Sequence, residues 1–147
     1  MDNSLLAFSQ LDGVAYLQAL LSVAYADGSI SIEEAQFIKE QASSLGIAIN
    51  PYEYDSSLDS FDPSSLSVVT KKLVIRDCIT LACIDKNYDE SERVKIFSLA
   101  QRYGLSKEFV CGIEAWLKEY WELIERGKAL IEVDTPDSSQ AGAPYRY

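Results

Sequence analysis

The sequence predicts an all-α protein, a compact bundle of about seven helices built from a duplicated helix-loop-helix unit. Apolar residues recur with the helical period of about 3.6 residues, and no stretch shows the sustained alternation of a strand. Two segments repeat one pattern of small, acidic and apolar residues: AYADGSISIEEAQFI at 24–38 and ACIDKNYDESERVKIF at 82–97. The 147 residues are enough to bury one core. We therefore expect a helical domain over residues 1–131 and a flexible tail over 132–147.

The first predicted helix covers residues 12–26. Its apolar residues, Leu17 among them, share one face, and Asp12 is available as an N-cap. The Asp27-Gly28 pair ends the helix, because glycine readily adopts the backbone conformation that follows a last turn.

The second predicted helix begins at Ser31 and is closed by Gly46. An acidic, serine-rich loop follows over residues 50–62, with a short helix expected at 57–61. The third predicted helix begins at Asp62-Pro63, a cap followed by proline in the first turn, and runs to about residue 84.

The next boundary repeats the first one, 58 positions further along the chain. Identical or similar residues fall at matching places, both on the apolar face and among the acids. The aligned pairs are Ala24 with Ala82, Asp27 with Asp85, Glu34 with Glu92, Ile38 with Ile96, Ala42 with Ala100, and Gly46 with Gly104. This agreement predicts a duplicated unit rather than a longer repeat array.

Ser106 caps the last predicted helix, which runs to about Ile131 with one apolar and one charged side. Its aromatic residues Trp116, Tyr120 and Trp121 are interpreted as core, with a partner groove as the alternative.

The composition restricts the function. A net charge of −10 argues against binding to a nucleic-acid backbone and favours a protein partner with a basic surface. Residues 1–70 contain ten acidic residues and one basic residue, which predicts an acidic interaction face. The absence of histidine excludes Ser-His-Asp and Cys-His catalysis and histidine-bound zinc.

Lys71, Lys72 and Arg76 form a small basic patch, interpreted as a solvated face or as a contact with a neighbouring copy in a homo-oligomer.

The cysteines and the hydropathy predict a cytoplasmic protein. Cys78, Cys83 and Cys111 are odd in number and have apolar neighbours, so we expect reduced thiols in the core. We find neither the pattern of a signal peptide nor an apolar run of membrane-spanning length.

The repeated glutamates have a structural explanation. Ser31-x-x-Glu34 is a capping box, and Asp89-x-x-Glu92 has the same spacing with Asp as the N-cap. Each glutamate is therefore expected to accept a hydrogen bond from a free backbone N–H, alone or together with another role.

The repeated aspartates Asp27 and Asp85 are harder to explain, because each follows a helix C-terminus that already carries partial negative charge. One explanation is an Asx-type turn to loop amides. The other is a hard cation held by carboxylates and loop carbonyls. Asp85, Asn87 and Asp89 imitate the start of an EF-hand loop, but Glu90 and the residues after it do not fit that motif. The second explanation predicts a weak Ca²⁺ or Mg²⁺ site with the ligands Asp27, Glu34, Asp85, Asp89 and Glu92, and with several waters on the ion. The sequence leaves both explanations open.

These residues also carry a family resemblance. The A-x-x-D-G-x(5)-E segment from Ala24 to Glu34, its second copy from Ala82 to Glu92, and the helix ends at Gly46 and Gly104 resemble the TerB-like family of tellurite-resistance proteins. The resemblance covers about residues 12–131. It implies a cytoplasmic bundle of about seven helices in which acidic residues chelate a metal, and on that pattern Asp27, Glu34, Asp85 and Glu92 are carried over. Lys86 departs from it, standing where the first copy has Gly28. Members are also fused to other modules, including a membrane-anchored DnaJ-type co-chaperone.

Three functions follow as hypotheses. The first is a non-enzymatic TerB-like module that acts as an acidic interaction scaffold, with a divalent cation between its two copies, linked to a stress or tellurite-resistance response. The second is a hydrolytic enzyme in which a carboxylate-held metal activates water. The third is a metal-free assembly protein in which all the acids cap helices or face solvent.

Overall fold

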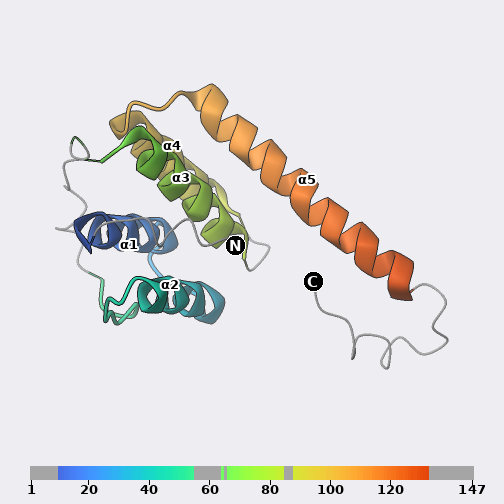
Figure 1. Ribbon diagram of the computed structural model, residues 1–147, viewed down its shortest axis with the longest axis horizontal. Helices are drawn as coiled ribbons and strands as arrows, with labels where there is room; N and C mark the ends of the chain where they lie inside the picture. Colours follow the sequence, from blue (N-terminus) through green and yellow to red (C-terminus); the bar gives the residue numbers. More distant parts are fainter. Residues whose placement is uncertain (1–9, 55–63, 65, 85–87, 133–147) are drawn as a thin grey trace. The chain divides into compact units, whose positions relative to one another are not determined.

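The computed structural model describes residues 10–54, 64, 66–84 and 88–132 (Figure 1). Within these residues the protein contains helices and no strand, which confirms the all-α class. The described part has five helices, fewer than the seven expected, and the short helix predicted at 57–61 lies outside it. The helices are α1 (Gln10–Ala24), α2 (Ile32–Ser44), α3 (Val68–Cys83), α4 (Glu90–Arg102) and α5 (Lys107–Glu132).

The chain divides into two compact units, Met1–Ile113 and Glu114–Tyr147. The first unit holds α1 to α4 and the first turns of α5. The second unit holds the rest of α5, which ends at Glu132, one residue beyond the end at about Ile131 that the sequence predicts for the last helix.

Helix α1 lies at the centre of the first unit and packs against α2, α3 and α4. Figure 1 shows α3 and α4 side by side, and these two helices are also in contact. The largest fully buried side chains come from all four helices and from the start of α5. They include Tyr16, Leu20, Ile38, Ile75, Ile79, Ile96 and Val110.

Burial repeats between the two copies, α1–α2 and α3–α4. Each aligned pair on the apolar face is buried in both copies: Ala24 and Ala82, Ile38 and Ile96, Ala42 and Ala100. Aligned apolar residues are thus buried in both copies, as the predicted duplication requires.

The two copies also end in the same way. Gly46 and Gly104 follow α2 and α4 with φ of +70° and +75°, in the left-handed region that glycine adopts without a steric penalty. At the first end, the N–H of Gly46 donates to the Ser43 carbonyl over 3.1 Å and the N–H of Ile47 donates to the Ala42 carbonyl over 2.9 Å. The second end repeats both bonds. This is the Schellman motif, so the predicted closing role of both glycines is confirmed.

Two predicted helix starts are wrong. Asp12 is not an N-cap, because α1 already includes Gln10. The third helix begins at Val68 rather than at Pro63, since the Ser67 side chain accepts a hydrogen bond from the Thr70 N–H and caps it there. The predicted start of the last helix is confirmed, with the Ser106 hydroxyl accepting from the Phe109 N–H over 3.1 Å.

Two expectations about the core are also corrected. Cys78 is buried, but Cys83 is half-buried and Cys111 is exposed on α5, so only the first is a core thiol. Trp116 and Tyr120 are exposed rather than buried, because they lie on a face of α5 that no described residue covers fully, and Trp121 is half-buried. Among the described residues, no helix combines the length and apolar character needed to cross a membrane.

Candidate functional site

Two capping boxes position Glu34 and Glu92. The Ser31 hydroxyl accepts from the Glu34 N–H over 3.1 Å, and Glu34 Oε1 accepts from the Ser31 N–H over 3.0 Å. In the second copy, Asp89 Oδ1 accepts from the Glu92 N–H over 2.9 Å, and Glu92 Oε1 accepts from the Asp89 N–H over 3.2 Å. Capping is therefore confirmed for both glutamates, and each box fixes its carboxyl at the first turn of a helix.

The two glutamates also meet each other. Glu34 is 4% exposed and Glu92 is 3% exposed, and their side chains are joined by a hydrogen bond. Burial raises the pKa of Glu92 from its ordinary 4.5 to about 8, with further contributions from the bond to Glu34 and from the charges of Glu34 and Asp89. We call Glu34 and Glu92 the carboxyl pair. A hydrogen bond between two carboxyl groups requires a proton on one of them, and the raised pKa of Glu92 means that the carboxyl pair holds this proton more readily than an isolated glutamate would.

Asp27 forms the Asx-type turn that was one of its two explanations from the sequence. It is exposed, and its Oδ1 accepts from the Ser29 N–H over 3.1 Å, which is an Asx-type turn. Its equivalent in the second copy, Asp85, lies outside the described residues.

Asp89 is occupied by its capping bonds. The N–H of Glu92 and the hydroxyl of Ser91, which donates over 2.7 Å, hold the pKa of Asp89 below its ordinary value. Within the described part of the chain, no three acidic or cysteine side chains lie close enough to hold a metal ion together. Of the five predicted ligands, the structure thus places two, Glu34 and Glu92, in direct contact. The site with all five ligands stays a prediction.

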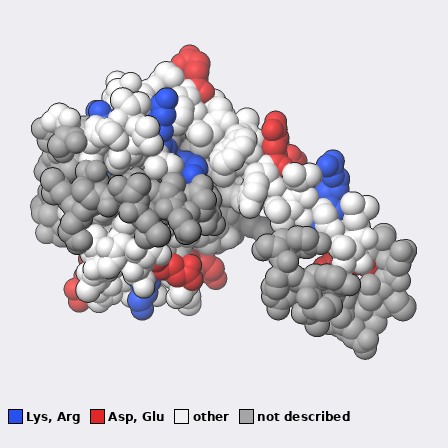
Figure 2. Space-filling model, in the orientation of Figure 1, with Lys and Arg blue, Asp and Glu red and all other residues white. Residues whose placement is uncertain are grey.

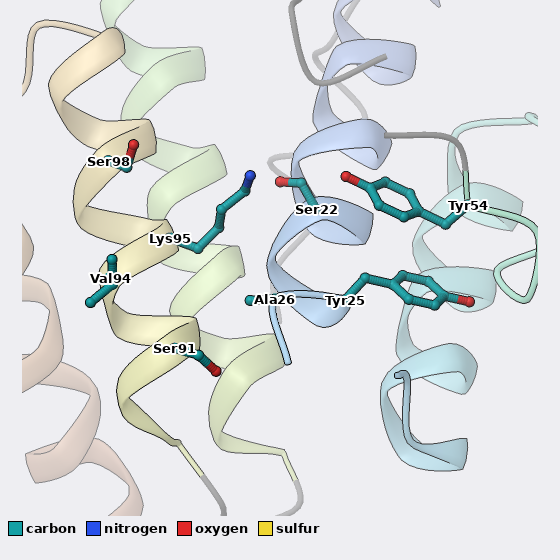
Figure 3. A pocket seen from close by; sticks show the side chains of 8 residues that line it. All are labelled: Ser22, Tyr25, Ala26, Tyr54, Ser91, Val94, Lys95 and Ser98. Atoms are coloured by element: carbon teal, nitrogen blue, oxygen red, sulfur yellow. The ribbon is translucent and has the colours of Figure 1, made fainter. Parts of the chain in front are cut away.

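A cavity of about 370 Å³ lies between α1 and α4 (Figure 3). Lys95 extends from α4 toward Ser22 on α1, and the rings of Tyr25 and Tyr54 stack beside them with centroids 4.8 Å apart. The cavity offers hydroxyl and ammonium groups rather than the carboxylates that a metal-dependent hydrolase needs, since neither member of the carboxyl pair lines it. Its lining residues are Ser22, Tyr25, Ala26, Tyr54, Ser91, Val94, Lys95 and Ser98.

A second buried polar cluster was missed in the sequence. Asp77 is 1% exposed on α3, where its Oδ2 accepts from the Tyr16 hydroxyl over 3.1 Å and its Oδ1 accepts from Arg76 Nε over 2.9 Å. Burial and the charge of Asp77 raise the pKa of Tyr16. Arg76 is therefore part of an internal ion pair, which corrects its assignment to a solvated basic patch. The available signal was the pair of opposite charges, Arg76 and Asp77, inside the apolar run LVIRDCITLAC.

The described surface carries both signs of charge. On the face that Figure 2 shows, acidic and basic side chains are interspersed rather than separated into two areas. The acidic interaction face accordingly stays a prediction from the sequence.

Comparisons with known proteins connect this architecture to one solved structure. No family model matches the sequence, and a search of curated proteins gives no match. A crystal structure of a tellurite resistance protein from Nostoc punctiforme PCC 73102 is similar to this chain with a TM-score of 0.56 and 23% sequence identity, covering 94% of this chain and 86% of that one. The chain therefore has the all-α fold of that tellurite resistance protein, and the predicted TerB-like resemblance is confirmed at the level of the fold.

Proposed function

We propose that this protein is a non-enzymatic, TerB-like helical module whose carboxyl pair binds a divalent cation and whose acidic surface binds a basic protein partner. The single observation that carries the cation role is the burial of Glu34 and Glu92 against each other. The partner role is supported by the net charge of −10.

Two adjacent buried carboxylates require a positive counterpart. Both cannot be ionised together without a large electrostatic cost, so a proton or a cation must occupy the pair. A hard cation with oxygen ligands, Ca²⁺ or Mg²⁺, meets this requirement, and waters and loop carbonyls complete its coordination. Asp27 and Asp85 follow the helices that precede the pair in each copy, and we propose them as the additional acidic ligands, which requires Asp27 to leave its Asx turn and move toward the pair when the cation binds.

The proton and the cation compete in this proposal. Since a carboxylate must lose its proton before it binds a metal, cation binding displaces the proton of Glu92. Affinity should then increase as the pH rises through about 8, the pKa of Glu92. This coupling distinguishes a site at the carboxyl pair from weak binding to exposed acids, which are ionised throughout that range.

Calorimetric titration with Ca²⁺ and with Mg²⁺ at pH 6.5 and 8.5 tests the proposal, with melting temperatures measured in parallel. We expect saturable binding that is stronger at the higher pH and that releases about one proton per ion at the lower pH. Glu92→Gln should abolish it, whereas Glu90→Gln, a change on the exposed side of the same helix start, should preserve it. Asp27→Asn and Asp85→Asn test the two additional ligands.

The alternatives give different results. No heat and no melting shift at millimolar ion at pH 8.5 would leave the metal-free assembly protein. Saturable binding accompanied by turnover of a hydrolysable ester would instead support the carboxylate-metal enzyme.

We also propose a cellular role in tellurite resistance, because the solved structure with a similar fold is that of a tellurite resistance protein. Expression in a tellurite-sensitive bacterial host should improve growth on tellurite, and Glu92→Gln should remove that improvement while Glu90→Gln keeps it. Equal growth with and without the protein would contradict this role.

A further inference from the structure

The second half of α5 exposes an apolar stripe, which we define as Trp116, Tyr120, Leu123, Gly127 and Leu130. Trp116 is 49% exposed, Tyr120 50%, Leu123 56% and Leu130 73%. Trp116 and Tyr120 also contact each other along the stripe, with ring centroids 6.4 Å apart. Large apolar side chains in one continuous row on a helix are typical of an interaction surface.

The spacing of the stripe identifies the kind of surface. Its residues alternate at intervals of four and three, which is the seam of a two-stranded coiled coil. The stripe spans about 21 Å of helix at about 1.5 Å per residue, so two heptads are available for pairing. A helix with the same seam is therefore the kind of partner that fits it.

Gly127 indicates how such a partner lies. A Cβ built at Gly127 would meet no atom within 4 Å, so no residue in the described part of the chain requires glycine there, although glycine is a poor helix former. If a second copy of α5 packs antiparallel, with Tyr120 opposite Leu123 of the other copy, then Trp116 lies opposite Gly127. In this arrangement the largest side chain of the stripe, Trp116, packs against its smallest residue, Gly127, of the other copy. The contact occurs twice because a two-fold axis relates the two copies.

Charge supports the same orientation. Glu119 and Arg126 lie along one edge of the stripe, seven residues apart. In an antiparallel pair this edge meets the same edge of the other copy, which brings Glu119 beside Arg126 in both directions. In a parallel pair Trp116 would face Trp116, Gly127 would face Gly127, and Glu119 would face the apolar Ile124.

We propose that two copies of this chain associate through an antiparallel pair of α5 helices, with Trp116 seated over Gly127 and Glu119 paired with Arg126 of the second copy. This interface is independent of the cation site proposed above. It involves only the second unit of the chain, so loss of cation binding leaves it unchanged.

A charge-exchange series tests the orientation. Sedimentation equilibrium of the full chain over a concentration series should show a monomer–dimer equilibrium. Glu119→Arg alone and Arg126→Glu alone should each weaken the dimer by roughly tenfold, because each replaces two attractive pairs with two repulsive ones. The double exchange should restore the original affinity. A monomer at every concentration, or a double exchange no better than the single ones, would overturn the proposal.

A size substitution tests the contact at Gly127. Gly127→Leu improves helix propensity but fills the space required by Trp116, so we expect a more stable helix and a weaker dimer. Gly112→Leu is the matched control, because its added Cβ also meets no atom within 4 Å and it lies outside the stripe. In a Trp121→Phe background, which leaves Trp116 as the single tryptophan, we expect a red-shifted emission for the monomer and a shift to the blue as the dimer forms. A blue-shifted monomer, in which the chain itself covers the stripe, would contradict the proposal, as would equal dimer affinities for the two variants.

Discussion

Glu92 differs from the other acidic residues because burial and two neighbouring carboxyl groups favour its protonated form. Its folded-state pKa is about 8, while the unfolded chain has the ordinary value of 4.5. Between these values the folded state binds more protons than the unfolded state, so the free energy of unfolding must fall as pH rises. The stabilising contribution is complete below about pH 4.5 and is lost as pH passes through about 8.

Glu92→Gln should remove most of this pH dependence. The amide is neutral at every pH and still offers both an acceptor to the Asp89 N–H and a donor to Glu34. We expect the wild type to lose roughly 1–3 kcal/mol between pH 5 and 8.5, less than the full shift implies because solvent screens part of the repulsion. Denaturant unfolding at several pH values measures it. Glu90→Gln, the exposed control, should retain the wild-type slope, and a slope unchanged by Glu92→Gln would contradict the proposed proton.

The Tyr16–Asp77 bond gives a second residue-level prediction. Tyr16→Phe removes the donor but leaves a buried acceptor on Asp77, which should lower the free energy of unfolding by about 1–3 kcal/mol. Tyr52→Phe makes the same change at an exposed position and should have little effect. Equal losses for the two variants, measured by urea unfolding, would mean that the buried bond contributes nothing specific.

Among the helices, the two Schellman ends can be compared directly. Gly46→Ala and Gly104→Ala force alanine to a φ near +70° and should each lower stability by about 1 kcal/mol. Gly112→Ala, within α5, should instead raise stability by roughly 0.5–1 kcal/mol, since alanine is the better helix former. Thermal melting of the three variants measures this. Changes of the same sign would show that backbone conformation does not control these ends.

The helices that the sequence predicted well are those with local boundary signals. Ser31 and Asp89 begin α2 and α4, and Gly46 and Gly104 follow their ends, because caps and left-handed glycines depend on neighbouring residues alone. The start of α3 could not be decided locally. Asp62-Pro63 and Ser67 are both acceptable caps by their local sequence. Leu66, just before Ser67, is buried, and such tertiary packing is not specified by the residues next to a cap.

At the scale of the whole molecule, equivalent residues of the two copies, Glu34 and Glu92, are in contact with each other. The repeat in the sequence identified these two residues. Their contact depends on how the copies pack, and spacing along the chain does not specify packing. Asp27 is aligned with Asp85 just as well, but its carboxylate accepts from the Ser29 N–H in an Asx turn instead of meeting the other copy.

A double-mutant cycle tests this contact between the copies. At pH 8.5, Glu34→Gln and Glu92→Gln should each relieve the same repulsion, so the double variant should gain less than the two single gains added together. The expected coupling is about 0.5–3 kcal/mol. Glu33→Gln and Glu90→Gln, both exposed, form the control cycle and should be additive. Additive effects at the carboxyl pair would place the two side chains out of contact.

The different N-caps of the two copies, Ser31 and Asp89, have a consequence for how a duplicated chain can evolve. If two identical half-length chains assembled about a two-fold axis, their two glutamates would be equivalent and would bind a shared proton equally well. In a single chain the two halves can differ, and the carboxylate of Asp89, which Ser31 lacks, is one of the charges that favour the protonated form of Glu92. A substitution at a helix start therefore contributes to making the two halves electrostatically unequal.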